Sequence, residues 1–178
     1  MRFSFPVAAV VVAALFLCGF RAPAAGTYGG VDTPVPDLTL QDLDGRAATI
    51  SETIRGWTLL KFGTTWCPQC EIQVKELNLL AAELEKRGVT VVEVFLREGA
   101  DVVAPKVQAT PRMYPHRILL DPEGEAIPAY KVRVIPRLVL VDPQGRVRDD
   151  TRFQTAEQIR ETLARLSVAP EEKASGDD

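Results

Sequence analysis

The sequence predicts an α/β fold, in which a central mixed β-sheet carries helices on both of its faces. Two observations predict it. Short β-branched or apolar segments alternate with segments of helical periodicity, and the last two strand-like segments are joined by a tight turn. The first pattern is that of parallel strands joined by helices, and the second adds an antiparallel hairpin to the same sheet. The 178 residues, of which 46% are hydrophobic, suffice for one domain with a buried core.

The strands are predicted from runs of β-branched and apolar residues. Two short alternating segments within residues 37–50, on either side of Asp44-Gly45, form a hairpin signal. The remaining strand-like runs are residues 57–63, 89–96, 116–121, 137–142 and 146–150. The first of these runs is apolar almost throughout, which is typical of a strand buried on both faces. The last two flank the turn Asp-Pro-Gln-Gly and predict the hairpin.

The helices are predicted between and after these strands. Following Pro68, apolar residues recur every three or four positions, which predicts one long helix with Gly88 as its C′ residue. Residues 101–109 form a second helical stretch. The last helix is predicted to start at Thr155, because Thr155 and Gln158 make a capping box.

The N-terminus carries the three-part pattern of a secretory signal: Arg2, an apolar run over residues 5–20, and small residues up to Ala24. We expect cleavage after Ala24. Two alternatives stay open. In the first alternative, the apolar run is retained as a membrane anchor, although it is shorter than the about 20 residues of a spanning helix. In the second, Cys18 is lipidated. Each alternative places the domain outside the cytoplasm, in the periplasm or tethered to the outer side of the cytoplasmic membrane.

The chain therefore divides into four predicted parts. They are residues 1–24 (signal peptide or N-terminal membrane anchor), 25–36 (linker), 37–168 (the α/β domain) and 169–178 (a polar, flexible tail). The formal net charge is −3, and no run of basic residues is present. Nucleic acid is therefore not an expected partner, and a membrane is expected to be contacted only through the N-terminal anchor.

The stretch Phe-Gly-Thr-Thr-Trp-Cys-Pro-Gln-Cys-Glu joins the first buried strand to the long helix. Cys67 lies at the N-cap of that helix, because Pro68 suits its first position. A thiolate at Cys67 faces the free N–H groups and the positive end of the helix, which stabilise it. Cys70 lies one turn further on the same face, within reach to close a disulfide. We therefore expect Cys67 to be an exposed nucleophile and Cys70 to resolve the mixed disulfide, with no cofactor beyond this redox pair.

Some other uses of the two cysteines are disfavoured by the sequence, and others stay open. A structural disulfide gains most by closing a long loop, and this one closes almost none. Zinc needs about four ligands, and His116 is the single histidine, so no metal site is predicted. Copper binding by the reduced pair stays open, although no cluster of Met or His lies nearby. A peroxidase using Cys67 also stays open: Thr64 stands three residues before it, but Leu60 occupies the place of the expected motif proline. A docking module that tolerates loss of Cys67 is a further alternative.

The region from Asp37 to Leu166 resembles the thioredoxin-like thiol–disulfide oxidoreductases, and within them the exported TlpA/ResA type. The matching stretches are LTLQDLDGR, LLKFGTTWCPQC, VTVVEVFL, ILLDPEG and YKVRVIPRLVLVDPQGRV. The resemblance implies a thioredoxin-like fold with an N-terminal β-hairpin extension and a central insertion. It also implies that the Ile135–Pro136 bond is cis and packs beside the cysteines. Ile135 would then pair with a substrate strand, and Trp66 would shape the docking surface.

The same resemblance implies a function. Members reduce disulfides in extracytoplasmic proteins, and a membrane electron carrier reduces them in turn. Protein thiols and disulfides, with apocytochrome c among the candidates, are therefore the expected substrates. The pair Pro68-Gln69 lacks the His of strongly oxidising exported relatives, which favours a reductant.

Several positions depart from the family pattern. Thioredoxin has a buried Asp six positions before the first cysteine and a Lys on the neighbouring strand. In this chain Lys61 stands where thioredoxin has the Asp, and Glu93 stands where it has the Lys. Because neither charge belongs in a buried strand unless paired, we expect a partly buried ion pair beneath Cys70, with Glu93 as a candidate proton relay. Arg137, Val134 and Gln73 stand where Thr, Gly and Glu are usual.

Overall fold

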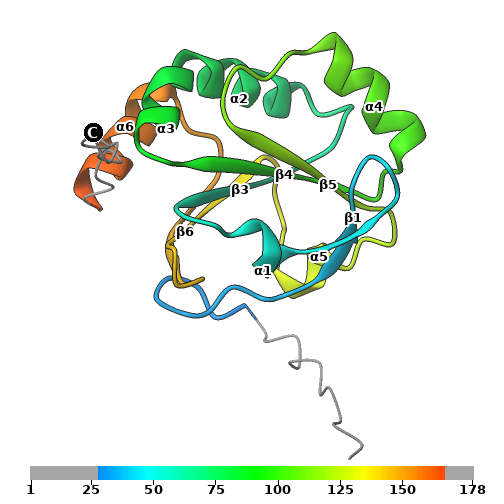
Figure 1. The fold of residues 1–178 in the computed structure, drawn as a ribbon, viewed down its shortest axis with the longest axis horizontal. Coiled ribbons are helices and arrows are strands. Elements are labelled where there is room, and N and C mark those ends of the chain that lie inside the picture. The colour runs from blue at the N-terminus through cyan, green and yellow to red at the C-terminus, as the bar shows by residue number, and fades with distance from the viewer. Residues whose placement is uncertain (1–27, 167–178) are drawn as a thin grey trace, which may run out of the picture.

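The computed structural model describes residues 28–166 and folds them around a seven-stranded mixed sheet with helices on both faces (Figure 1). The elements run in the order β1 (Thr39–Gln41), β2 (Ala47–Thr49), α1 (Ile50–Thr53), β3 (Thr58–Gly63), α2 (Pro68–Leu79), α3 (Ala81–Lys86), β4 (Thr90–Leu96), α4 (Ala100–Ala109), β5 (His116–Asp121), α5 (Ala126–Ala129), β6 (Arg137–Val141), β7 (Val147–Thr151) and α6 (Ala156–Arg165). The predicted fold class is confirmed.

The strand order β2-β1-β5-β4-β3-β6-β7 places β3 near the centre of the sheet. Strands β3, β4 and β5 are parallel, and β6 runs antiparallel to β3. The β1–β2 hairpin extends the sheet beyond β5, and the β6–β7 hairpin closes the other edge. The carboxyl ends of β3 and β4 therefore lie beside the start of β6, at one end of the central strands. In open α/β sheets, ligands bind at the carboxyl ends of the strands.

Two core layers hold the helices against the sheet. On one face, apolar residues of α2, α3 and α6 pack with those of the strands, among them Leu77, Leu84 and Ile159. On the other face, Phe62 and Tyr130 belong to a second cluster, with ring centroids 4.7 Å apart. All six residues of β3 are buried, as expected for a strand covered on both faces.

The long helix predicted from Pro68 to Gly88 is broken at Leu80, and this prediction is wrong in that respect. Leu80 leaves helical geometry, with φ −102° and ψ 5°. The side chain of Asn78 donates to the Pro111 carbonyl at 3.0 Å and accepts from the Met113 N–H at 2.9 Å. These bonds fix the last turn of α2 to the segment before β5, and α3 begins after Leu80. The apolar periodicity continues through the break and gave no sign of it.

The predicted end at Gly88 is confirmed. Gly88 has a φ of +62°, and its N–H bonds to the Glu85 carbonyl while the Val89 N–H bonds to the Leu84 carbonyl. This pair of bonds is the Schellman arrangement, which needs a left-handed residue at C′. The capping box of Thr155 and Gln158 is also present at the start of α6.

The described part of the predicted linker, residues 28–36, packs against the domain. Tyr28 is buried in the core, and its hydroxyl donates to Asp150 Oδ2 at 2.6 Å. Pro34 forms a bridge with Arg146, and the Val35 N–H bonds to the Gly145 carbonyl. The segment therefore covers the β6–β7 turn. The predicted signal or anchor, residues 1–24, and the tail, residues 169–178, lie outside the described residues. Within 28–166, no helix has the length and apolar character that crossing a membrane requires.

Candidate active site

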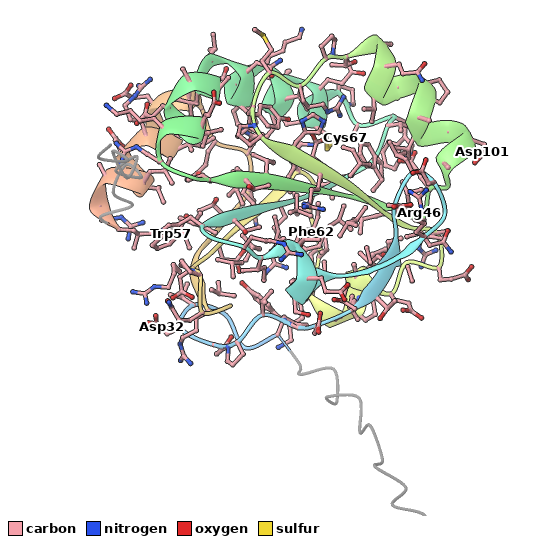
Figure 2. The ribbon with its side chains drawn as sticks, viewed as in Figure 1. Asp32, Arg46, Trp57, Phe62, Cys67 and Asp101 are labelled. Carbon is pink, nitrogen blue, oxygen red and sulfur yellow. A yellow bond between two sulfur atoms is a disulfide. The ribbon has the colours of Figure 1, made fainter. Side chains whose placement is uncertain are left out.

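Cys67 lies at the N-terminal end of α2 (Figure 2), beyond the carboxyl end of β3, and Cys70 lies in the first turn of the helix. Cys67 is the N-cap residue and Pro68 occupies the first helical position, as predicted. Cys67 and Cys70 form a disulfide with Cα atoms 5.2 Å apart. The Cys70 N–H points to Cys67 Sγ, with N and Sγ 3.1 Å apart. The N-terminal end of α2 thus faces the sulfur of Cys67, where it stabilises negative charge.

Cys67 was expected to be exposed, and the structure corrects this for the disulfide form. Only 5% of Cys67 and 3% of Cys70 is exposed. The reason is that Cys67 Sγ is bonded to Cys70 Sγ and accepts from the N–H of the helix instead of facing solvent. The neighbouring Trp66, by contrast, is 72% exposed. An incoming group therefore meets Trp66 before it meets sulfur.

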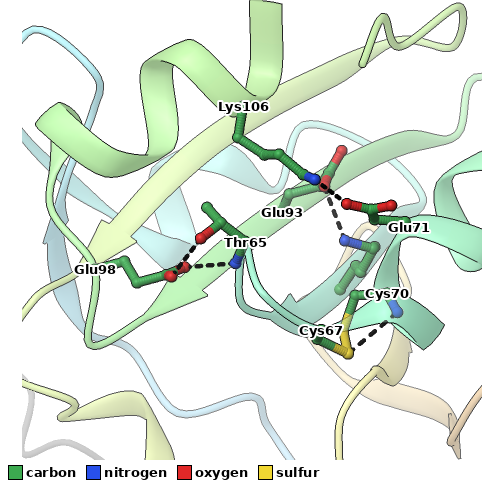
Figure 3. The surroundings of a disulfide bond; sticks show 8 residues. Thr65, Cys67, Cys70, Glu71, Glu93, Glu98 and Lys106 are labelled. Atoms are coloured by element: carbon green, nitrogen blue, oxygen red, sulfur yellow. Dashed lines mark hydrogen bonds and ion pairs between the residues drawn. A yellow bond between two sulfur atoms is a disulfide. The ribbon is translucent and has the colours of Figure 1, made fainter. Parts of the chain in front are cut away.

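The loop that presents Cys67 is fastened to the end of β4 by Glu98. The carboxylate of Glu98 accepts from the Thr65 N–H at 2.7 Å and from the Thr65 hydroxyl at 2.6 Å (Figure 3). Glu98 is itself buried. Sequence reasoning did not single it out, since nothing local relates it to a loop 33 positions earlier in the chain.

The first turn of α2 also carries an ion pair. Glu71 pairs with Lys106 of α4, as Figure 3 shows. A carboxylate so close to Cys67 would oppose a thiolate, and the lysine offsets that charge. Gln73, two residues further on, is buried and makes paired hydrogen bonds with the backbone of Gln154, at 3.0 and 2.9 Å. The amide both donates and accepts there, which a glutamate at this position could not do.

The expected pair of Lys61 and Glu93 is present, and it is fully buried. Lys61 Nζ lies 2.9 Å from Glu93 Oε2, on directly paired residues of β3 and β4. Arg112 donates to both carboxylate oxygens, at 2.8 and 3.1 Å, and the Tyr114 hydroxyl donates to Oε1 at 2.9 Å. Sequence reasoning missed Arg112 and Tyr114, which lie on the segment leading into β5.

These four hydrogen bonds determine the state of Glu93. Burial raises the pKa of the carboxyl, but the charges of Lys61 and Arg112 and their hydrogen bonds outweigh it and lower the pKa to about 2. Burial and the neighbouring carboxylate also raise the pKa of Tyr114. All four lone-pair positions of Glu93 are engaged, so the ionised group has no free place for a proton. The geometry favours a positioning role for Glu93, and proton transfer through it stays a prediction.

The cluster lies directly below Cys70. A Cβ on Gly63 would stand 3.0 Å from Cys70 Sγ and 3.7 Å from Lys61 Nζ, so both groups border the same spot. A cavity of about 10 Å³, at the lower limit for one water molecule, is lined by Cys70, Lys61, Lys106 and Arg112, among others. Three cations therefore lie on the inner side of Cys70, together with Glu71, the partner of Lys106.

The start of β6 completes the site. The Ile135–Pro136 bond is cis, which confirms what the family resemblance implies. Arg137 pairs in register with Phe62, one residue before the end of β3, so Pro136 lies level with the loop that carries Cys67. Ile135 lines a groove with Trp66 and Thr64. The docking roles of Trp66, Ile135 and Pro136 remain predictions.

Arg137 itself is an anchor within the domain. It donates to both carboxylate oxygens of Asp150, at 2.8 and 2.7 Å, and lies over the Tyr28 ring at 4.7 Å from its centroid. It also donates to the Tyr130 carbonyl. These contacts fix the start of β6 and account for a large cation where Thr is usual.

The remaining candidate residue, His116, lies apart from this site on β5, where its Nδ1 is 3.0 Å from the Tyr114 carbonyl oxygen. Among residues 28–166, no group of three or more His, Cys, Asp or Glu side chains is arranged to hold a metal ion.

Comparison with known proteins agrees with the fold and the cysteine pair. The ResA thiol–disulfide oxidoreductase of Bacillus thuringiensis subsp. konkukian (strain 97-27) is 27% identical over 167 residues, covering 88% of this chain and 94% of the relative. That of Geobacillus thermodenitrificans (strain NG80-2) is 29% identical over 138 residues, covering 77% of this chain and 78% of the relative. Among solved structures, a putative thiol:disulfide interchange protein DsbE from Chlorobium tepidum has a TM-score of 0.66 and 23% identity, over 80% of this chain and 99% of that one.

The fold and the cysteine pair, with these relatives, define a thioredoxin-like thiol–disulfide oxidoreductase. The chain belongs to the AhpC/TSA family, whose model matches residues 31–150. The resemblance inferred from the sequence is thus confirmed.

Proposed function

We propose that the protein is exported and reduces disulfide bonds of extracytoplasmic proteins through the dithiol form of Cys67 and Cys70. One observation carries this proposal. Cys67 caps α2 with its sulfur 3.1 Å from the Cys70 N–H, and its disulfide partner lies one turn further along the same helix. Export is supported by the signal-like pattern of residues 1–24.

The first step uses the helix end. In the reduced protein, the thiolate of Cys67 attacks one sulfur of the substrate disulfide. The substrate S–S bond breaks, a mixed disulfide with Cys67 forms, and the other substrate sulfur leaves as a thiolate that takes up a proton. The N–H of Cys70 and the positive end of α2 stabilise the attacking thiolate.

The second step uses Cys70. Its sulfur attacks Cys67 Sγ in the mixed disulfide, the Cys67–Cys70 bond closes, and the second substrate sulfur leaves and is protonated. Two electrons have then passed from the protein dithiol to the substrate. The cations Lys61 and Arg112 below Cys70 favour its thiolate form for this attack.

The reaction needs no cofactor beyond the cysteine pair, but the disulfide that it leaves must be reduced again. A membrane electron-donor protein is the source that the family resemblance suggests. Disulfide-bonded extracytoplasmic proteins are the proposed substrates, and apocytochrome c is one candidate among them. The oxidised pair described here is the state that this donor would meet.

The peroxidase alternative receives less support from the geometry. Leu60, in the place of the motif proline, lies in the middle of β3, paired with Val92 and Val139 on its two sides. A proline there would remove a hydrogen bond from a central strand. The Thr64 hydroxyl, which would have to assist Cys67, has no hydrogen-bond partner within residues 28–166.

Two serine variants test the proposal. Reduced full-length protein is mixed with an oxidised protein substrate in a single turnover, and the products are trapped with acid and separated by mass. Cys67→Ser should give no reaction, whereas Cys70→Ser should accumulate a mixed disulfide through Cys67. Equal turnover by Cys67→Ser and the wild type would overturn the assignment of the nucleophile. Turnover of peroxide but not of disulfides would favour the peroxidase.

A further inference from the structure

An open groove begins beside the cysteine pair, at the carboxyl ends of β3 and β4. It has a volume of about 360 Å³, and its lining includes Thr64, Trp66, Arg97, Val134 and Ile135. Trp66 is 72% exposed and Val134 is 46% exposed. Large apolar side chains kept in solvent next to a reactive group indicate a surface that a partner covers.

A second hollow of about 240 Å³ adjoins the first, because Arg133 and Val134 line both. Lys131, Arg137 and Arg152 belong to its lining. The two hollows therefore form one continuous surface on both sides of the segment before the cis proline. The second hollow lies where the start of β6 pairs with the end of β7.

Four exposed cations gather on this surface. Arg97, Lys131, Arg133 and Arg152 are all exposed, and none makes an ion pair or a side-chain hydrogen bond with another of residues 28–166. The only carboxylate in the lining is Asp150, which Arg137 already holds. The chain as a whole has a net charge of −3. Positive charge therefore exceeds negative charge on this surface, although the chain as a whole is acidic.

Two details show that this surface is built rather than incidental. Arg97 has a φ of +57°, and its side chain lies against Gly124, where a Cβ would stand 2.9 Å from Arg97 Cγ. The fold thus holds that cation at the wall of the groove.

Thr64 is only 8% exposed, and its hydroxyl finds no hydrogen-bond partner within the described residues. Thr151 leaves its hydroxyl unpartnered in the same way, in the lining of the second hollow. The two residues line the two hollows, and buried polar atoms of this kind are usually paired.

We propose that this surface, the docking face (Trp66, Arg97, Lys131, Arg133, Val134 and Arg152), selects partner polypeptides whose reacting cysteine is flanked by acidic residues and by one apolar side chain. The apolar side chain covers Trp66 and Val134, and the carboxylates meet Arg97 and Arg133. Opposite charges across such a contact accelerate encounter and disfavour basic partners. The inference rests on the proposed function, because the occupant must present its disulfide to Cys67.

Three probes test the docking face with reduced full-length protein in single turnovers. Two are synthetic peptides with one cysteine as a mixed disulfide with 2-mercaptoethanol, identical except that four flanking positions are Asp in one and Lys in the other. The third is hydroxyethyl disulfide, which is small and uncharged. Each rate is divided by that of the same probe with dithiothreitol, so that the intrinsic reactivity of the disulfide cancels.

We expect the wild type to reduce the acidic peptide about tenfold faster than the basic one at low ionic strength, and the ratio to shrink as salt is added. Arg133→Glu should lower the rate at which the acidic peptide is reduced about tenfold, and should leave the rate for hydroxyethyl disulfide within about twofold of the wild type. The matched control is Arg117→Glu, an exposed arginine of β5 that lines a separate pocket with Asp42 and Asp44. It should leave all three rates within about twofold, because its charge lies outside the docking face.

Several outcomes would overturn the inference. Equal rates for the two peptides in the wild type contradict it, as does an Arg133→Glu variant that slows all three probes alike. If Arg133→Glu instead weakens co-sedimentation with phosphatidylglycerol vesicles while the peptides react equally, the face contacts a membrane and not an acidic polypeptide. A wild type that reduces none of the probes, hydroxyethyl disulfide included, refutes the proposed function itself, which separates the two failures.

Discussion

Lys61 Nζ lies 2.9 Å from Glu93 Oε2, on directly paired residues of two parallel strands at the centre of the sheet. Arg112 and Tyr114 supply three further hydrogen bonds to the same carboxylate. The cluster of one acid and two cations carries a net positive charge under Cys70. Its charged side chains are buried, so their charge acts on Cys70 with little screening by solvent.

Glu93→Gln separates a positioning role for Glu93 from proton transfer. The amide leaves Lys61 and Arg112 without a counter-charge, so the positive charge below Cys70 grows and alkylation of Cys70 at pH 7 should become faster, as measured by mass spectrometry in a Cys67→Ser background. A proton relay predicts slower resolution of mixed disulfides by Cys70 instead. Unpaired buried charges should also lower the free energy of unfolding by about 3–5 kcal/mol.

Lys61→Met serves as the companion variant, because Glu93 keeps its bonds to Arg112 and Tyr114. Alkylation of Cys70 should then become slower than in the wild type. If the two variants change the rate in the same direction, charge below Cys70 is not the cause.

The acid sensitivity of the fold should reflect Glu93. Its pKa is lowered from 4.5 to about 2 in the folded protein. The ionised carboxylate therefore stabilises the fold at pH values above its pKa in the unfolded chain, and that contribution is lost as the pH falls toward about 2. The loss should be on the order of 3 kcal/mol. Urea unfolding of the oxidised protein between pH 6 and pH 2.5 measures it. Glu93→Gln should show a shallower decline than the wild type, and parallel curves would contradict this assignment.

Gly63→Ala tests the close approach of β3 to Cys70. The added methyl would stand 3.0 Å from Cys70 Sγ, so this sulfur must shift. We expect resolution by Cys70 to change severalfold, while formation of the mixed disulfide at Cys67 stays within about twofold. Gly56→Ala is the matched control, because its methyl would meet only the Gly88 carbonyl at 3.4 Å. Equal effects on both steps would show that the contact does not act through Cys70.

Arg137→Thr restores the residue that is usual in the family and removes the bonds to Asp150 and the contact with the Tyr28 ring. The free energy of unfolding should fall by about 2–4 kcal/mol, because a bidentate pair and a cation–π contact are lost. Arg137→Lys should recover only part of it, since an ammonium cannot bind the carboxylate through two parallel N–H groups. Full recovery by lysine in a urea titration would mean that charge alone matters.

The features predicted correctly from the sequence were those written in contiguous residues. The runs Trp57–Gly63 and Val89–Leu96 are too apolar for an exposed strand, and the Cys67-Pro68 pair defines a helix start by itself. The Lys61–Glu93 pair was also predictable, because two charges in neighbouring buried strands require each other.

Features that depend on distant contacts were not predictable. The break at Leu80 comes from bonds between Asn78 and the segment before β5, while the local pattern stays helical. Glu98 and Arg112 reach their partners only after the chain has folded, because 33 and 19 positions respectively separate each partner pair. The burial of Cys67 follows from the disulfide geometry, which a spacing of three residues does not specify.

The most direct test of the central claim is the reduction potential of the Cys67–Cys70 couple, measured by equilibrating the protein with glutathione buffers and counting free thiols. The proposed reductase requires a value near that of thioredoxin, about −270 mV, so that the dithiol gives up its electrons readily. A value near about −120 mV would mean that the dithiol form is the stable one and that the protein oxidises its partners, which would contradict the direction proposed here.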